Sequence, residues 1–544
     1  MYSHNDLNQK STGIPQSPLQ FYLRVLSKIP TLGLNQASKR TTNITIIFCI
    51  LIIVLTLSFS IKVNAPGIPG GIDVFEQDYF REISECTTAL ASGYATPDGR
   101  PLLWKNRDVG NSNQEYHYVD DGRIPFIGLT YGNIRSFEYY AGVNAVGFAI
   151  ENSNSYNLGQ RARRNGWGGG ADDGEIQALA LATCRTVDDF QILLDSLDNA
   201  EGRTRNSNYG TFDAFGGAAM FETGGFQYFR HDAVDAPDGF LVRSNYSYSG
   251  NGLENRGNSW GPNRHDRAFK LFSDAVNGNF LTYEFIIQWV IRNLNAVDMD
   301  GYELPFRNYY ENQPFGWIPN GRTVCRGTTA SVFVAQGVRE GETPDKTIIW
   351  ALTGNPYGVI TTPLWVRAGS VPLEHNGQVS SRLCNAARDV KSWVTIGGCA
   401  NTFRLCNDSN TGYWDWMFPY ERSIFRRVEA FRNSPGFSND RLEAFQNLVA
   451  RQVADSIENW RPAFRTHEIA EPIFWDNRVS LFWEPAENVG FGRDCSPRGY
   501  NVYRNSNPFR DGDSGECIAY VEGTQFTDDK QLSGRAYYRV EVVY

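Results

Sequence analysis

The sequence is poor in histidine, the side chain that most often serves as general base in enzymes. Only six histidines occur among 544 residues, and none belongs to a papain-type signature, since no Cys-Gly-Ser-Cys-Trp run is present. Net positive charge is lacking too: the formal charge is −9 at pH 7, so no global basic field exists to hold nucleic acid. A papain-type mechanism and a nucleic-acid partner are therefore disfavoured.

Signals for a metal or a nucleotide are also missing. No spacing of His, Cys, Asp and Glu is typical of a metal site. The glycine-rich segment 166–170 lacks the strand–turn–helix context and the Lys-Ser/Thr pair of a phosphate-binding loop, and is interpreted as a flexible loop. We expect neither a metal nor a cofactor.

One long apolar run is present near the start of the chain. Residues 44–61 are uncharged and mostly apolar, which just reaches the length of a membrane span. Basic residues outnumber acids in 1–43, so the positive-inside rule predicts a disordered cytoplasmic tail, a signal anchor at 44–61 and an extracytoplasmic remainder. A signal peptide with a long n-region is the alternative. Segment 62–85 is predicted as a linker and propeptide.

The most informative segment is a predicted β-hairpin whose first strand opens with a cysteine. Two strand-like runs flank a Pro-Asp-Gly turn at 97–99. If the turn centres on Pro97-Asp98, Cys86 faces position 109, and a one-residue bulge brings Asp108 beside the sulfur. The second run ends in Lys-Asn-Arg-Asp at 105–108. The hairpin thus delivers a carboxylate and two cations to a thiol without a histidine.

This arrangement resembles the N-terminal-nucleophile hydrolases, above all the cysteine acyltransferase/hydrolase family that includes the fungal penicillin-forming acyltransferase and carcinine hydrolase. Later segments look like the family's motifs in the same order, namely Gly142–Ala149, Asn208–Glu222, Leu241–Tyr246, Arg326–Ser331 and Pro363–Val366. The likeness covers roughly residues 82–375. It departs from the family at Glu85, where the fungal member has Gly, and at Tyr246, where a histidine is often found.

The resemblance implies a fold and a chemistry. The fold is α+β, a four-layer αββα N-terminal-nucleophile hydrolase domain over residues 86–470. Cys86 is the nucleophile, its own α-amino group is the general base, and Glu85–Cys86 is the bond that the chain cuts in itself. Asp108 orients the α-amino group, and Lys105 takes the place of an arginine near the nucleophile. The alternatives are a buried strand cysteine for Cys86 and a strand-end salt bridge of Asp108 with Lys105 or Arg107.

Further polar residues complete the predicted site. Asn245 is the predicted oxyanion donor, because an amide aimed at the tetrahedral intermediate stabilises it. Asn245-Tyr246-Ser247 is also a glycosylation sequon, and Asn245 can equally be a turn asparagine. Asn152 is a second pocket donor or a loop residue. Arg326 holds a substrate carboxylate or pairs with an acid, and Arg107 is grouped with these two as substrate-binding.

Local patterns predict several elements of secondary structure. Helices are expected near Glu175–Arg185 and from an N-cap at Thr186 to about Leu197, with a further helical region at 420–459. Strands are expected at 329–335 and 347–352. In an exported chain, Cys399 with Cys406 and Cys495 with Cys517 are candidate disulfide pairs.

Residues 472–544 change character. An early Trp, a Gly-Tyr-Asn-Val-Tyr-Arg run at 499–504 and a late Tyr-Tyr-Arg-Val run at 537–540 alternate with turns. This resembles a fibronectin type III domain, a β-sandwich, for which we expect a spacer or adhesion role.

Taken together, these patterns predict an exported, autoprocessed cysteine enzyme that cleaves or transfers an acyl group at a C–N amide bond through a Cys86 thioester. The expected partner is a small-molecule amide or N-acyl compound. Two alternatives stay open: a dipeptidase of the same superfamily, whose motif also begins Cys-Thr-Thr, and a non-catalytic surface protein that binds a partner.

Overall fold

A computed structural model describes residues 85–132, 138–159, 171–200, 202–251, 261–295, 317–377, 380–396, 398–407 and 410–460, and, in the C-terminal part, 466–467, 470–475, 478–483, 499–506, 516–528 and 536–543. All of these lie in the second of the two units of the chain, Phe80–Tyr544. The predicted tail, membrane segment and propeptide before Glu85 fall outside them. Within the described residues, no helix combines the length and apolarity needed to cross a membrane.

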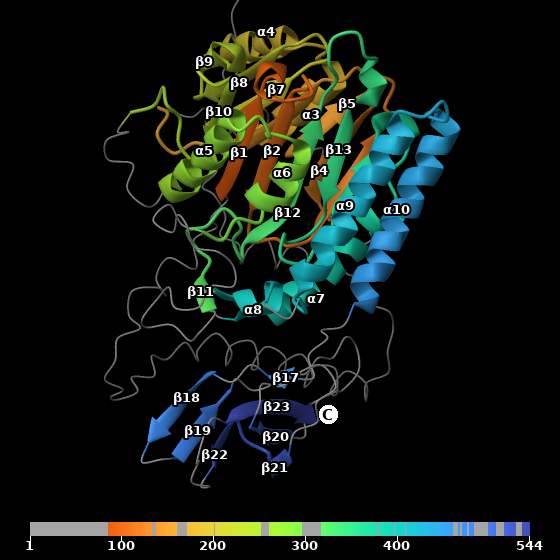
Figure 1. Cartoon of the computed structure of the whole chain (residues 1–544). Helices are drawn as coiled ribbons and strands as arrows, with labels where there is room; N and C mark the ends of the chain where they lie inside the picture. Colours follow the sequence, from red (N-terminus) through yellow and green to blue (C-terminus); the bar gives the residue numbers. More distant parts are fainter. Residues whose placement is uncertain are drawn as a thin grey trace, which may run out of the picture. The chain divides into compact units, whose positions relative to one another are not determined.

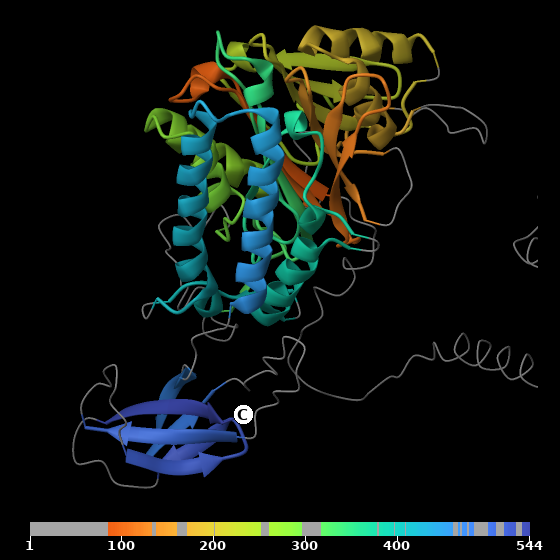
Figure 2. The same cartoon turned by 90° about the vertical axis from the view of Figure 1, so that its right-hand side faces the viewer.

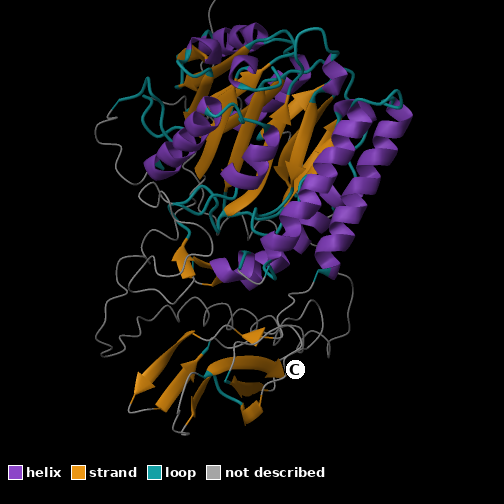
Figure 3. Ribbon diagram, in the orientation of Figure 1, coloured by secondary structure: helices purple, strands orange, loops and turns teal. Residues whose placement is uncertain are grey.

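Two antiparallel sheets form the centre of the main body (Figures 1 and 3). The six-stranded sheet has the spatial order β10 (Phe240–Arg243), β1 (Glu85–Ala91), β2 (Leu102–Asp108), β12 (Thr329–Gln336), β13 (Ile348–Leu352) and β14 (Thr362–Leu364). The seven-stranded sheet follows the chain order: β3 (Gln114–Val119), β4 (Phe126–Tyr131), β5 (Ala141–Asn144), β6 (Ala149–Asn154), β7 (Ser207–Phe212), β8 (Ala218–Thr223) and β9 (Tyr228–Asp232).

Helices pack outside both sheets. Those described are α3 (Asp173–Thr183), α4 (Val187–Asp198), α5 (Pro262–Asn277), α6 (Tyr283–Phe285), α7 (Arg382–Val394), α8 (Thr402–Leu405), α9 (Tyr413–Arg432) and α10 (Asn439–Asn459). The long helices α9 and α10 run side by side (Figures 1 and 2). A third, smaller sheet has the order β11 (Trp317–Pro319), β16 (Cys399–Asn401) and β15 (Thr395–Ile396).

Three apolar cores separate these layers. Between the two sheets, Leu90 and Leu103 from the first sheet join Ile127 and Met220 from the second. The outer face of the six-stranded sheet packs on α5, α7, α9 and α10, and the outer face of the seven-stranded sheet packs on α3 and α4. The order of layers is therefore helices, sheet, sheet, helices, and the α+β class predicted from the sequence is confirmed.

The predicted helix starting at Thr186 is confirmed as α4. The Thr186 side chain accepts from the backbone N–H of Asp189, and Asp189 returns a bond to the Thr186 N–H, which is a capping box. The first predicted helix is α3, which begins earlier, at Asp173, and ends at Thr183. The strands predicted at 329–335 and 347–352 are β12 and β13.

The prediction of one helical region at 420–459 is wrong in its continuity. The region contains most of α9 and all of α10, and the chain turns between them at Ser434-Pro435-Gly436. Proline lacks the N–H that a continuing helix needs, and glycine favours a turn. The proposed Cys399–Cys406 disulfide is also wrong, because the sulfur of Cys406 is not bonded to another cysteine. Cys517 is free, and Cys495 lies outside the described residues.

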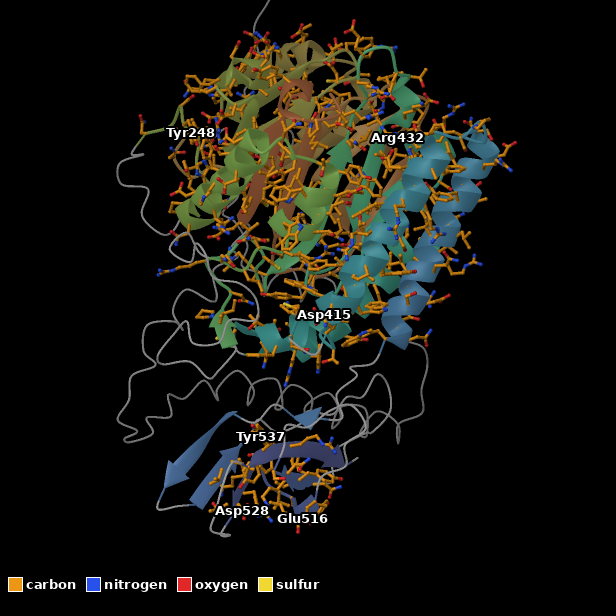
Figure 4. The ribbon with its side chains drawn as sticks, in the orientation of Figure 1. Tyr248, Asp415, Arg432, Glu516, Asp528 and Tyr537 are labelled. Atoms are coloured by element: carbon orange, nitrogen blue, oxygen red, sulfur yellow. The ribbon has the colours of Figure 1, made fainter. Side chains whose placement is uncertain are left out.

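The C-terminal part contains two further antiparallel sheets. One has the order β17 (Thr466–His467), β23 (Tyr537–Val543), β20 (Gly499–Asn505) and β21 (Glu516–Val521), and the other has β18 (Ala470–Trp475), β19 (Arg478–Phe482) and β22 (Gln525–Asp528). Val479, Leu481, Trp483, Tyr500, Val502 and Val540 form their shared core. In this part, Arg504 and the hydroxyl of Tyr538 both contact Asp528, which Figure 4 labels.

Candidate active site

The predicted hairpin exists, with a register that differs from the prediction. Cys86 pairs with Arg107, not with position 109, and Asp108 pairs with Glu85 without a bulge between β1 and β2. The connection contains a short 3-10 turn, Gly93–Ala95, before the turn that closes at Gly99, whose φ of 74° favours glycine. This extra turn moves the centre of the hairpin and shifts the pairing.

The register divides the hairpin's polar side chains between two faces. Residues directly opposite each other in an antiparallel pair share a face, and the face alternates along each strand. Cys86, Lys105 and Arg107 therefore share the face of Leu103, which belongs to the core between the sheets. Glu85 and Asp108 share the opposite face, toward the helices.

Cys86 is almost fully buried, with 4% of its surface exposed. Burial raises the pKa of its thiol and Asp108 adds to the rise, while Lys105, Arg107 and a backbone hydrogen bond from Asp108 oppose it. The net shift is upward. The thiol is thus neutral in the intact chain and needs a base to become a nucleophile.

Asn245 meets the main-chain nitrogen of Cys86. The Cys86 N–H donates to Asn245 Oδ1 at 3.2 Å, and Asn245 Nδ2 donates to the carbonyl of Asn154 at 3.0 Å. An amide NH2 has two hydrogens, and the described residues accept one of them, so the other can donate to an oxyanion. Asn245 is fully buried in the folded chain, so its glycosylation sequon is inaccessible there.

A buried polar network holds the segment that carries Asn245. Asn208 Nδ2 donates to the carbonyls of Ser244 at 3.3 Å and Tyr246 at 3.2 Å, and Asn208 Oδ1 accepts from the Ser247 hydroxyl at 2.6 Å. Fixing the backbone on both sides of the amide preorganises it. The segment Asn208–Glu222, which resembles a motif of the family, thus begins with a residue that positions Asn245.

The strand before this segment is anchored by a buried ion pair. Arg243 Nε donates to Glu222 Oε1 at 2.6 Å, and the Arg243 guanidinium lies 3.8 Å from the ring centre of Tyr248, which Figure 4 labels. Burial opposes ionisation of Glu222, but His231, Arg243 and the N–H groups of Tyr248 and Ser249 outweigh it and lower the Glu222 pKa to about 2. Glu222 is a fixed anion.

Two other motif residues connect strand turns to helix ends. Asn144 Nδ2 donates to the carbonyls of Leu181 and Cys184 at 2.9 and 2.8 Å, at the end of α3. Asp213 Oδ2 accepts from the Val187 N–H at 2.8 Å, at the start of α4. These contacts give both residues a structural role in the layer outside the seven-stranded sheet.

Arg264, at the start of α5, is a site residue that sequence reasoning missed. Its Nη1 donates to the Cys86 carbonyl at 2.7 Å and to the Thr87 hydroxyl at 2.8 Å, and its Nη2 donates to Asn245 Oδ1 at 2.9 Å. It also donates to Glu85 Oε2 at 3.0 Å. Arg264 thereby joins both sides of the Glu85–Cys86 bond to Asn245. No local pattern singles it out.

Arg326 and Asp108 complete a cluster on the helix-facing side, here called the arginine cluster (Glu85, Asp108, Arg264, Arg326). Arg326 Nη1 contacts Glu85 Oε2, and Asp108 Oδ2 lies 3.7 Å from Arg264 and 3.6 Å from Arg326. Burial raises the Asp108 pKa, and the two arginines and Thr329 reduce that rise. The salt bridge of Asp108 with Lys105 or Arg107 considered above is wrong, since its cationic partners are Arg264 and Arg326.

On the opposite face of the β1–β2 strand pair lies the lysine cluster (Lys105, Glu151, Asn152, Asp173). Lys105 Nζ donates to the Tyr140 carbonyl at 2.7 Å and to Asn152 Oδ1 at 2.6 Å. Asn152 Nδ2 in turn donates to Asp173 Oδ2 at 2.8 Å, so Asn152 bridges a buried cation and a buried acid.

The groups of the lysine cluster titrate far from their usual pH. Burial raises the Glu151 pKa to about 8, although Lys105 opposes the rise. Burial and the neighbouring Asp172 raise the Asp173 pKa to about 7, against Arg205 and Lys105. Burial lowers the Lys105 pKa, opposed by Cys86 and Glu151. Buried groups with pKa values near neutrality are typical of functional sites.

Arg107 lies near the same face but is held by aromatic rings. Its guanidinium carbon is 4.0 Å from the ring centre of Tyr131 and 4.1 Å from that of Tyr140, and its Nη1 donates to Gln114 Oε1 at 2.6 Å. Its predicted role in substrate binding stays a prediction. In the part of the chain that the structure describes, no group of three or more His, Cys, Asp or Glu is placed to hold a metal.

No protein-family model matches the chain, and no curated protein matches its sequence. Among solved structures, similar chains include a variant of conjugated bile acid hydrolase from Clostridium perfringens, at 13% identity and TM-score 0.28, covering 52% of this chain and 97% of that one. A penicillin V acylase from Agrobacterium tumefaciens has 11% identity and TM-score 0.32, with coverages of 52% and 86%. An N-acylethanolamine-hydrolyzing acid amidase ortholog from Caenorhabditis elegans has 13% identity and TM-score 0.27, with coverages of 36% and 86%.

Proposed function

We propose that this protein is a self-processed cysteine amidohydrolase or acyltransferase in which Cys86 becomes the N-terminal nucleophile. One observation carries the proposal: separate side chains hold the main-chain nitrogen and oxygen of this buried cysteine. Asn245 binds its N–H at 3.2 Å and Arg264 binds its carbonyl at 2.7 Å. A cysteine that serves only packing needs neither contact.

These contacts support a self-processing step at the Glu85–Cys86 bond. The Cys86 sulfur attacks the Glu85 carbonyl carbon, a C–S bond forms, the C–N bond breaks, and the thiol proton passes to the departing nitrogen. Water then hydrolyses the thioester and leaves Cys86 with a free α-amino group. An α-amine with an ordinary pKa near 7.7–8.0 is a suitable general base near neutral pH.

Turnover repeats the same steps on an external amide. The α-amine takes the thiol proton, the sulfur attacks the amide carbonyl, and the ammonium returns the proton to the leaving amine. The free hydrogen of Asn245 Nδ2 stabilises the oxyanion, and Lys105 favours the thiolate. Water or a second amine then resolves the Cys86 thioester, giving hydrolysis or acyl transfer. Asp108, predicted to orient the α-amine, lies against Arg264 and Arg326 in the uncut chain, and in this proposal it keeps these two arginines in place.

Export remains part of the proposal: a membrane anchor at 44–61 before processing, an extracytoplasmic catalytic part, and a fibronectin type III-like spacer at 472–544.

The dipeptidase alternative is separated by assaying dipeptides beside N-acyl amino acids. The binding-protein alternative requires an unreactive Cys86 and an uncut chain.

The direct test compares Cys86→Ala with Cys184→Ala, a control that removes another buried thiol. We expect Cys86→Ala to abolish both chain cutting and amide turnover, and Cys184→Ala to keep both. Turnover retained by Cys86→Ala would contradict the mechanism.

A further inference from the structure

The side chain of Glu85 occupies a built anion site. Its carboxylate contacts both Arg264 and Arg326, and only 13% of the side chain is exposed. The Arg264 side chain is 2% exposed and that of Arg326 is 14% exposed. Glu85 is also the residue whose carbonyl the Cys86 sulfur attacks in the proposed self-cut.

The charges of this cluster balance only while Glu85 is present. Two guanidiniums, Arg264 and Arg326, face two carboxylates, Glu85 and Asp108. Hydrolysis of the Glu85 thioester allows the Glu85 carboxylate to depart, which leaves one carboxylate for two buried cations. A buried charge without a partner is strongly unfavourable, so the cut site favours a new anion.

The main chain at Arg326 is held in place independently of Glu85. Asn355 Nδ2 donates to the Arg326 carbonyl at 3.0 Å and to the Thr329 carbonyl at 2.6 Å, which fixes the turn that carries Arg326. Arg264 keeps its bonds to the Cys86 carbonyl and to Asn245. The anion site therefore persists when Glu85 leaves.

The acyl-enzyme links this site to the substrate. In self-processing, the acyl group on the Cys86 sulfur is the Glu85 residue, and in turnover the substrate's acyl group is bonded to the same sulfur beside the same free amine. Resting on the function proposed above, we propose that the substrate's acyl half carries a carboxylate separated by three carbons from the reacting carbonyl, as in glutaryl and α-glutamyl amides. Arg264 and Arg326 bind this carboxylate where they now bind that of Glu85.

The experiment measures how two small amides protect Cys86 of the self-cut protein from alkylation by iodoacetamide. Glutaramate carries the carboxylate, and pentanamide is a neutral amide of the same chain length. We expect glutaramate to protect at a concentration at least about tenfold lower than pentanamide. Arg326→Gln should abolish this preference, and Arg230→Gln, which alters an arginine paired with Asp188 and Asp232 on β9, should keep it.

The inference would be overturned if the two amides protect Cys86 equally, if glutaramate does not protect it, or if the preference for glutaramate survives Arg326→Gln. If Arg326→Gln does not cut itself, the wild-type comparison alone decides. A wild-type chain that stays uncut contradicts the proposed function and this inference together, whereas a cut chain without preference contradicts this inference alone.

Discussion

The two faces of the β1–β2 pair handle charge in different ways. On the helix-facing side, Arg264 and Arg326 meet Glu85 and Asp108 directly, cation against anion. On the side between the sheets, Lys105 donates to two neutral oxygens, and Asn152 links it to the buried acid Asp173. Cys86 lies at the junction: Arg264 binds its main chain, and Lys105 has the largest charge effect on the pKa of its thiol.

This difference separates positioning from titration. Ion pairs between arginine and carboxylate keep their charge over a wide pH range, so the arginine cluster is suited to hold the Glu85–Cys86 bond and the acyl carboxylate of the proposed substrate. The lysine cluster contains acids with pKa values of about 7 and about 8, so its net charge changes near neutral pH. We therefore expect pH to act on the proposed activity mainly through the lysine cluster.

The largest effect is expected from breaking the arginine cluster at its centre. Arg264→Gln removes the charged donor to the Cys86 carbonyl and to Asn245, and we expect kcat/KM to fall about 10³-fold, with slower self-cutting. Arg292→Gln is the control, since Arg292 is equally buried but pairs with Glu421. Per folded molecule, the control should keep its rate. A near-normal rate for Arg264→Gln would show that the cluster does not position the nucleophile.

A smaller loss is expected from the other face. Because Lys105 lowers the Cys86 thiol pKa, Lys105→Met should raise that pKa and reduce kcat about 10²-fold. The pH profile of alkylation of Cys86 measures the shift, and Lys105→Arg should restore part of it. An unmoved profile for Lys105→Met would separate Lys105 from the chemistry.

The pH dependence of stability tests the acids of the lysine cluster. Glu151 has a pKa of about 8 in the folded chain, against an ordinary value of 4.5, so the folded state binds the extra proton between these values. Binding of this proton by Glu151 stabilises the folded state fully below pH 4.5, and this stabilisation is lost as the pH rises to 8. Between pH 6 and 7.5 this amounts to about 2 kcal/mol, since each unit contributes about 1.4.

Glu151→Gln should remove this slope, as measured by urea unfolding at pH 6 and 7.5. The wild-type free energy of unfolding should fall with pH by more than that of the variant. Equal pH dependence in the two proteins would mean that Glu151 is ionised throughout this range.

The smallest effect is expected at the bridge itself. Asn152→Ala removes the amide between Lys105 and Asp173, and we expect kcat to fall about tenfold while the Arg326-dependent preference for glutaramate is kept. Steady-state kinetics and the protection assay measure the two quantities. Loss of the preference in Asn152→Ala would mean that the two faces are not separate.

The sequence predicts those parts of the site that follow from local patterns. The hairpin follows from the Pro-Asp-Gly turn between two apolar runs, and α4 follows from Thr186 and Asp189 in a capping box. The register was not predictable from the turn residues, because the 3-10 turn Gly93–Ala95 lengthens the connection. The break between α9 and α10 was visible in the sequence as Ser434-Pro435-Gly436, a turn signal inside a helical pattern.

Tertiary contacts account for what sequence reasoning missed. Arg264 follows Cys86 by 178 positions and reaches it only because α5 packs beside β1 and β10. Glu151 and Asp173 were not recognised because their raised pKa values come from burial. The sequence places one acid in a strand and the other at the start of a helix, and neither position indicates that the side chain is buried. Asn152, by contrast, could be selected from the sequence, although its link to Lys105 could not.

The measurement that tests the central claim most directly is the intact mass and N-terminal sequence of the purified protein. The proposed mechanism predicts a polypeptide that begins at Cys86 in the wild-type protein and is absent from Cys86→Ala. A wild-type chain still joined through Glu85–Cys86 would contradict it, because Cys86 would then have no free α-amine to act as base.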